Sequence, residues 1–204
     1  MNEKEAARRA NGQLYDYRKV EDDSWMRMRI LLPKINNAPA PEASRKLLEQ
    51  VIGTFPKSAT INTPFFADLG HHIHLGQRVV INMDCLFLDE GLITIKDGSM
   101  IGPRCCFYTP IHPMDPEVRA TGLETALPIT VEENVWIGGS CVINGGVTIG
   151  KGSVIGSGSV VTHDIEPGVF AVGNPCTIIR KIDEEESLYW KKLYEDYLAQ
   201  TSVK

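Results

Sequence analysis

One histidine of this chain lies where a proton-transfer group could act, in a polar segment that interrupts an otherwise regular sequence. His112 belongs to the proline-containing segment 108–128, which also holds Glu124. Imidazole has an ordinary pKa of about 6.5, so it can accept a hydroxyl proton at neutral pH as a general base. A carboxylate such as Glu124 could hold the ring in the useful orientation. A loop histidine and a surface glutamate can equally be just solvated, so the two residues alone leave both interpretations open.

A second group of ionisable side chains is the cluster His71, His72 and His74. In an extended strand alternate side chains share a face, so His72 and His74 could form a metal-binding pair. We favour the simpler interpretation, that these histidines are polar residues on an outer wall or at a subunit contact. We therefore predict no metal site.

The elements that position these residues are indicated by a six-residue repeat between positions 131 and 162. Three repeats form one turn of a triangular coil, and stacked turns pair as parallel strands about 4.8 Å apart. The recurring aliphatic residues, which should fill the interior, are Val131, Ile137, Ile143, Ile149, Ile155 and Val161. The sequence thus predicts a mainly β protein built as a parallel β-helix.

The same spacing recurs between residues 75 and 87 and between residues 95 and 107. It is interrupted at 89–91, and it is absent from 108 to 128 before it returns at Val131. We infer that 108–128 is a loop that leaves the coil, and long ordered loops on rigid scaffolds commonly carry function.

Four of the five cysteines fall at the small position of the repeat, four residues after an aliphatic residue. These are Cys85, Cys105, Cys141 and Cys176, and only Cys106 lies outside the pattern. We interpret the four as small buried hydrophobic residues. The chain has no pair of CxxC motifs of the kind that binds zinc.

The two ends of the chain lack the repeat and are predicted to be helical. In residues 1–57 we expect helices at 3–10, after Asp22–Ser24, and from Pro41, all packed over the first coils. A C-terminal helix should begin near Asp183, and its aromatic side should dock on its own coils or on a neighbouring subunit. The predicted division is an N-terminal helical cap (1–57), a β-helix (58–181) with the loop 108–128, and a C-terminal helix and tail (182–204).

The composition excludes several classes of protein. A net charge of −5 and a pI near 5.6 argue against a nucleic-acid binder, which needs a basic face. No apolar run reaches the roughly 18 residues of a spanning helix, and residues 1–4 do not begin a secretory signal. We therefore expect a cytoplasmic protein that contacts no membrane.

With the coil, the histidine loop and the helical ends placed, the chain resembles the maltose and galactoside O-acetyltransferases of the hexapeptide-repeat acyltransferase superfamily. The resemblance runs nearly end to end and is carried by residues 14–16 (LYD), 81–85 (INMDC), 108–113 (YTPIHP), 134–139 (NVWIGG) and 173–175 (GNP). It implies a left-handed β-helix and a homotrimer with active sites between subunits. Acetyl-CoA would be the co-substrate, and a sugar hydroxyl would accept the acetyl group.

The resemblance also implies roles for individual residues. His112 would be the general base for direct transfer of the acetyl group, with Glu124 as its partner. Asn82 would contact the acceptor and stabilise the developing oxyanion. The positions implied for the acceptor pocket are Asp16, Arg27, Asp68, Asn82, Asp89 and Glu90. Which of the adjacent Asp89 and Glu90 faces the acceptor stays open.

For the coenzyme, the implied positions are Trp136, Gly139, Ser157, Thr162, His163, Thr177 and Arg180. Relatives usually carry a basic residue where this chain has His163, and often another at Thr177. Arg180, with Lys181 beside it, is then the main positive charge left for the coenzyme phosphates. We expect acetyl-CoA binding that is weaker and more pH-sensitive than in typical relatives.

Three other functions are alternatives to sugar acetylation. A β-helical enzyme of the carbonic anhydrase type needs three zinc-binding histidines across a subunit seam, whereas this chain crowds three within four residues. A non-catalytic trimeric scaffold or binding protein is the second, and an acetyltransferase for an antibiotic or an amino sugar is the third. An acetyl-cysteine intermediate at Cys105 or Cys106 is less simple than direct transfer.

Overall fold

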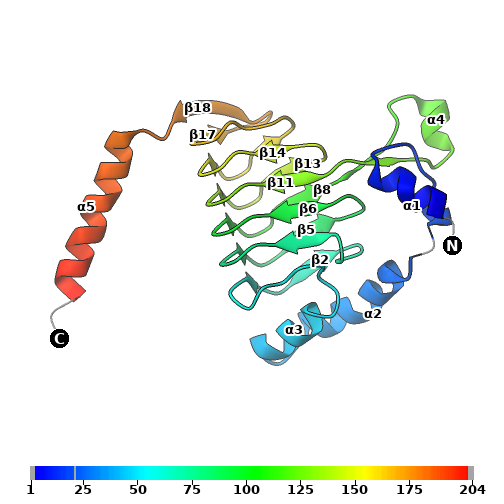
Figure 1. Cartoon of the computed structure of the whole chain (residues 1–204), viewed down its shortest axis with the longest axis horizontal. Helices are drawn as coiled ribbons and strands as arrows, with labels where there is room; N and C mark the ends of the chain where they lie inside the picture. The colour runs from blue at the N-terminus through cyan, green and yellow to red at the C-terminus, as the bar shows by residue number, and fades with distance from the viewer. Residues whose placement is uncertain (1–2, 21, 202–204) are drawn as a thin grey trace.

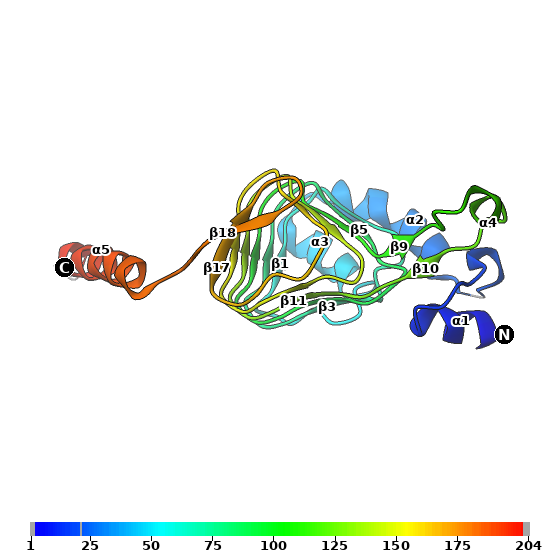
Figure 2. The same ribbon diagram turned by 90° about the horizontal axis from the view of Figure 1, so that it is seen from above.

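The computed structural model describes residues 3–20 and 22–201 and shows a coil of short parallel strands with helices at its ends (Figure 1). The strands of the coil form three sheets, which are the three faces of a triangular prism (Figure 2). The seven-stranded sheet contains β1 (Thr60–Ile61), β4 (Val80–Ile81), β7 (Met100–Ile101), β12 (Trp136–Ile137), β15 (Val154–Ile155), β17 (Val169–Val172) and β18 (Thr177–Lys181). The five-stranded sheet contains β2 (Phe65–Ala67), β5 (Cys85–Leu88), β8 (Cys106–Tyr108), β13 (Val142–Asn144) and β16 (Val160–Val161). The four-stranded sheet contains β3 (Ile73–Leu75), β6 (Ile93–Ile95), β11 (Ile129–Val131) and β14 (Thr148–Ile149).

The register confirms the predicted repeat, because each aliphatic residue pairs with the equivalent residue of the next coil. Ile101 pairs with Ile137, and Ile137 pairs with Ile155, all in parallel strands. All six predicted interior residues between positions 131 and 161 are fully buried. The predicted parallel β-helix is therefore confirmed.

The cysteines stack along one corner of the prism, as the repeat predicts. Cys85, Cys105, Cys141 and Cys176 are buried, and Cys106 is half-buried. The thiol of Cys105 donates to the carbonyl oxygen of Gly138 in the next coil at 3.1 Å. A small side chain here can turn inward at the corner and still satisfy its weak donor.

Two edges of the prism matter for function. The Asn82 edge is where the chain passes from the seven-stranded to the five-stranded sheet, and it includes residues 82–84, 102–105, 138–141 and 156–159. The His112 edge is where it passes from the five-stranded to the four-stranded sheet, and it includes residues 68–72, 89–92, 109–128 and 162–164. The five-stranded sheet separates the two edges.

The loop 108–128 leaves the coil at the His112 edge, as predicted, but it has structure of its own. Strands β9 (Pro110–Ile111) and β10 (Thr125–Ala126) pair antiparallel, and the short helix α4 (Pro116–Ala120) lies between them. The Asp115 side chain caps α4 by accepting a 2.9 Å hydrogen bond from the backbone N–H of Val118. The loop is therefore an ordered platform.

The N-terminal segment forms α1 (Glu3–Ala10), a 3₁₀ turn η1 (Tyr17–Lys19), α2 (Ser24–Asn36) and α3 (Pro41–Leu48). Helices α2 and α3 cover the first coil, as predicted, and bury Met28, Ile35 and Leu48. The prediction was wrong for α1, which lies against β10 of the loop (Figure 1). The reason is that the chain after α1 is bound to the loop through backbone hydrogen bonds between Tyr15 and Glu124.

The C-terminal part departs from the coil after β17. Strand β18 runs antiparallel to β17. The inward residue of β17 that continues the column of Ile155 is Ala171. Helix α5 (Glu184–Thr201) starts where predicted, with the Asp183 carboxylate accepting from the backbone N–H of Glu186. It stands away from the coil (Figures 1 and 2), and none of its described side chains is buried, so it does not dock on its own coils. No helix in the described ranges is long and apolar enough to cross a membrane.

Candidate active site

His112 follows β9 in the ordered loop and projects toward a carboxylate. Its Nε2 lies 3.9 Å from Oε2 of Glu124, and its side chain is 59% exposed while that of Glu124 is 9% exposed. The loop thus brings together the two residues that the sequence had singled out. An accessible imidazole beside a nearly buried carboxylate is an arrangement suited to proton transfer with a reactant that enters from solvent.

Glu124 is fixed by a buried tyrosine. The hydroxyl of Tyr15 donates a 2.5 Å hydrogen bond to Oε1 of Glu124. The two residues also exchange backbone hydrogen bonds of 2.9 and 3.2 Å, which tie the N-terminal segment to the loop. Burial and the Glu124 carboxylate raise the pKa of Tyr15, so its hydroxyl remains a donor at physiological pH. Tyr15 therefore orients Glu124, and Glu124 faces His112.

These side chains open into a cavity of about 500 Å³ between the N-terminal segment, the coil and the loop. It is lined by Arg9, Tyr15, Tyr17, Val20, Asp22, Trp25, Leu69, Glu90, His112 and Glu124. The lining combines aromatic surface with several charged groups, which is typical of a pocket for a small polar molecule.

Glu90 supplies a second carboxyl group to this cavity. Burial, and then the charge of Asp68, raise its pKa to about 8. Burial also raises the pKa of Asp68. Glu90 therefore keeps a proton at neutral pH, and this pair can both donate and accept hydrogen bonds.

The side chain of Asp89 points away from this cavity, toward the preceding coil. It is fully buried, and its Oδ1 accepts hydrogen bonds from the backbone N–H groups of Asp68 (3.1 Å) and Leu69 (2.8 Å). Burial raises the pKa of Asp89 to about 6. Of the two adjacent carboxyl groups, Glu90 therefore lines the cavity, whereas Asp89 binds the backbone of the preceding coil.

Asp16 and Arg27, which the resemblance implies for the acceptor pocket, are not among the residues that line this cavity. The Asp16 carboxylate is bound by Arg18 at 2.7 and 3.0 Å and by Lys19 at 3.2 Å, and the hydrogen bond from Arg18 lowers its pKa to about 2. It also caps η1. Arg27 lies on the outer side of α2, near Met26 and Ile30.

The sequence missed Arg9 and Trp25 as cavity residues. Arg9 reaches the cavity from α1 and lies 3.5 Å from Asp22, with only 11% of its side chain exposed. No sequence signal marked it, because a basic residue in a short helix is ordinarily solvated. Trp25 belonged to a predicted apolar stripe, but it is 45% exposed at the cavity wall.

The three clustered histidines have separate partners. Nε2 of His71 lies 3.6 Å from Asp22, Nδ1 of His72 lies 2.7 Å from the carbonyl oxygen of Asp89, and His74 bonds Thr54 at 2.9 Å. Burial lowers the pKa of His72 to about 4, so this ring is neutral at physiological pH. The described part of the chain holds no group of three or more His, Cys, Asp or Glu side chains arranged to bind a metal ion.

Asn82 lies on the Asn82 edge, one whole face away from the cavity. Its Oδ1 accepts a 2.8 Å hydrogen bond from the backbone N–H of Met83, which leaves the NH₂ group as the end that can donate to a ligand. Within one chain, therefore, the structure does not bring Asn82 together with His112.

The residues expected to bind the coenzyme divide in the same way. Gly139 and Ser157 lie on the Asn82 edge, whereas the exposed Thr162 and His163 lie on the His112 edge. The remaining three lie on the seven-stranded sheet: Trp136 on β12, and Thr177 and Arg180 on β18.

Trp136 and Arg180 belong to one outward column of the seven-stranded sheet. The register runs from Trp136 to Val154, Phe170 and Arg180, three strand spacings or about 14 Å in all. The column joins an indole, apolar surface and a guanidinium, which fits an elongated thioester with an apolar arm and anionic phosphates. Arg180 is also ion-paired to Glu186 at the start of α5, so its charge is partly engaged.

Comparisons with known proteins agree with this fold. Residues 128–163 match the family described as bacterial transferase hexapeptide (six repeats). The galactoside O-acetyltransferase of Escherichia coli strain K12 is 34% identical over 180 residues, covering 87% of each chain. A maltose O-acetyltransferase from Clostridium difficile 630 has a TM-score of 0.85 and 37% identity, covering 88% of this chain and 98% of that one. A hexapeptide-repeat acetyltransferase from Vibrio cholerae, crystallised with acetyl coenzyme A, has a TM-score of 0.83 and 32% identity, covering 88% and 99%.

Proposed function

The chain belongs to the hexapeptide-repeat acetyltransferases, and on that premise we propose that it transfers an acetyl group from acetyl-CoA to a hydroxyl of a sugar. The observation that carries the proposal is the alignment of Tyr15, Glu124 and His112 beside a cavity with polar groups. Its chemistry fits a hydroxylated acceptor better than an apolar one, because the Glu90 carboxyl group, which keeps its proton, can donate and accept hydrogen bonds there.

In this mechanism His112 is the general base. Acetyl-CoA, when bound, supplies a thioester whose carbonyl carbon is open to attack by a hydroxyl oxygen. With Nε2 of His112 facing Glu124, Nδ1 takes the hydroxyl proton as the new C–O bond forms. The same nitrogen then returns a proton to the coenzyme sulfur as the C–S bond breaks. Glu124 stabilises the imidazolium between these steps.

Asn82 acts from a neighbouring subunit in this proposal. A site that needs both His112 and Asn82 cannot be assembled by one chain, because the five-stranded sheet separates their edges. A homotrimer solves the problem if the His112 edge of each subunit faces the Asn82 edge of the next. The amide of Asn82 then donates to the thioester oxygen as negative charge develops on it.

The same arrangement unites the divided coenzyme residues. Thr162 and His163 would approach acetyl-CoA from one subunit, and Gly139 and Ser157 from the other. The exposed apolar surface also supports assembly, since Val80, Met100 and Trp136 form one outward column of the seven-stranded sheet. Closed rings of identical subunits are a common way to cover such a surface. The exposed aromatic side of α5 is a further surface that a neighbouring subunit could cover.

A thiol-release assay with acetyl-CoA and a panel of sugars tests the proposal, run with His112→Ala beside the wild type. We expect turnover with at least one sugar and a loss of about 10²- to 10⁴-fold in kcat for the variant. His74→Ala is the matched control, because His74 lies on the four-stranded sheet and bonds Thr54. Near wild-type turnover by His112→Ala, or no release with any hydroxyl acceptor, would refute this function.

A further inference from the structure

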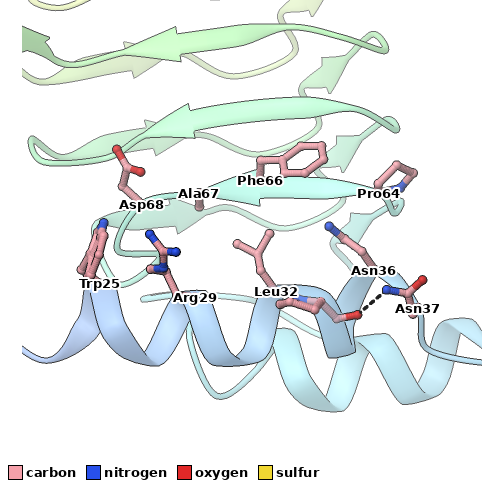
Figure 3. Close-up of a pocket in the computed structure, with 10 residues that line it drawn as sticks. Trp25, Arg29, Leu32, Asn36, Asn37, Pro64, Phe66, Ala67 and Asp68 are labelled. Carbon is pink, nitrogen blue, oxygen red and sulfur yellow. Dashed lines mark hydrogen bonds between the residues drawn. The ribbon is translucent and has the colours of Figure 1, made fainter.

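A second cavity lies beside the first, along helix α2. It has a volume of about 620 Å³ and runs between α2 and strand β2. Figure 3 shows Trp25 and Asp68 at one end, Leu32 and Phe66 in the middle, and Asn36, Asn37 and Pro64 at the other. From Trp25 to Asn36 the helix rises about 16 Å, so the groove is longer than one small molecule needs.

Two residues connect this groove to the reaction cavity. Trp25 lines both spaces. Asp68 lines the groove, and its charge raises the pKa of Glu90, which lines the reaction cavity. The groove is therefore a continuation of the acceptor pocket past Trp25.

The groove offers both ring surfaces and polar groups. The Trp25 indole is 45% exposed, and the Phe66 ring is 42% exposed. The Arg29 guanidinium lies 4.8 Å from the centroid of the Trp25 ring, and none of the ion pairs found among the described residues includes Arg29. It can therefore donate hydrogen bonds, while the Asp68 carboxyl can accept them.

At the other end of the groove, the polar side chains are hydrogen-bonded to the backbone. The Asn36 amide donates to the carbonyl oxygen of Phe65 and accepts from its N–H, both at 2.9 Å. Asn37 donates to the carbonyl oxygen of Pro33 at 2.7 Å (Figure 3). Ligand recognition is thus concentrated on Trp25, Arg29, Phe66 and Asp68.

We propose that this groove binds further sugar units of an oligosaccharide acceptor, whose end unit lies beside His112. The inference rests on the proposed function and specifies its substrate class. Sugar rings present apolar C–H faces to aromatic rings and hydroxyls to charged groups, and the groove supplies both kinds of partner in sequence. Its continuity with the reaction cavity favours an extended acceptor over an unrelated ligand.

The proposal is tested by measuring acetyl transfer to two series of sugars of increasing length. One series is glucose, maltose and maltotriose, and the other is galactose and lactose. We expect kcat/KM in at least one series to rise by about tenfold or more from the monosaccharide, equivalent to about 1.4 kcal/mol. Arg29→Ala and Phe66→Ala should each reduce the ratio of kcat/KM for the longer sugar to that for the monosaccharide. Met26→Ala, on the outer side of α2, is the control that should keep the ratio.

Two results would overturn the proposal. One is a ratio near one for the wild type in both series. The other is a ratio that Arg29→Ala and Phe66→Ala leave unchanged while the subunit number measured by light scattering falls, which would mean that a second copy of the chain covers the groove. Failure of the proposed function is a separate outcome, because then no sugar of any length would release thiol.

Discussion

The hydroxyl of Tyr15 and the carboxylate of Glu124 are joined by a 2.5 Å hydrogen bond across 109 residues of sequence. This bond holds the N-terminal segment against the histidine loop, and it fixes the carboxylate that faces His112. One contact therefore serves both the fold and the proposed chemistry.

Two substitutions separate these roles. Tyr15→Phe removes the donor and leaves a buried carboxylate oxygen without its partner, at a cost of about 1–3 kcal/mol in the free energy of unfolding. Glu124→Gln keeps the size of the side chain but removes the charge that stabilises the imidazolium, and kcat should fall by on the order of 10²-fold or more. Thermal melts and thiol release measure the two effects. Glu117→Gln, on the exposed helix α4, should alter neither; full activity of Glu124→Gln would contradict its role.

Mixed assemblies test whether each site uses two subunits. His112→Ala and Asn82→Ala should each be nearly inactive alone. When the two variants are co-expressed in equal amounts, about one site in four combines an intact His112 with an intact Asn82 from the neighbour. About a quarter of wild-type activity should return, whereas no recovery in a verified mixed oligomer would argue that each chain builds its own site.

The pH dependence of stability should report on Glu90. Its pKa is about 8 in the folded protein and near 4.5 in the unfolded chain, so the folded state keeps a proton that the unfolded state loses. The free energy of unfolding should therefore fall as pH rises between these values. Glu90→Gln should reduce the fall in Tm between pH 5 and pH 8, with a smaller fall remaining because the pKa of Asp89 is about 6. An unchanged pH dependence in the variant would exclude Glu90 as its source.

The affinity for acetyl-CoA should be limited by a shortage of positive charge near the coenzyme phosphates. Arg180 is ion-paired to Glu186, and the family resemblance implies a basic residue at the position of His163. His163→Lys adds a firm charge at an exposed corner, so acetyl-CoA should bind more tightly by on the order of two- to fivefold at low salt. Calorimetric titration at low and high salt measures the gain and its screening. Equal affinities of the variant and the wild type at neutral pH would mean that His163 does not meet the phosphates.

The fold was largely predictable because a β-helix follows from a local, six-residue sequence repeat. In each six-residue unit, such as the one around Ile137, the position of a residue within the repeat alone decides whether its side chain points inward or outward. The departure at 108–128 was equally visible, since the pattern stops there and resumes at Val131.

The wall of the cavity was decided by tertiary structure alone. The sequence placed α1 over the first coil, whereas its contact with the loop brings Arg9 to the cavity. It could not distinguish Asp89 from Glu90, because the choice depends on which side chain finds the backbone N–H groups of the coil below. Nor did it indicate that Arg18 and Lys19 bind the Asp16 carboxylate.

The sequence by itself determined the coil, its interior, its ejected loop and the histidine that the loop carries. Only the tertiary structure decided which side chains surround that histidine. The physical reason is the range of the interactions: the coil repeats one local arrangement from turn to turn, whereas the pairing of Tyr15 with Glu124 joins distant segments whose meeting no local pattern records.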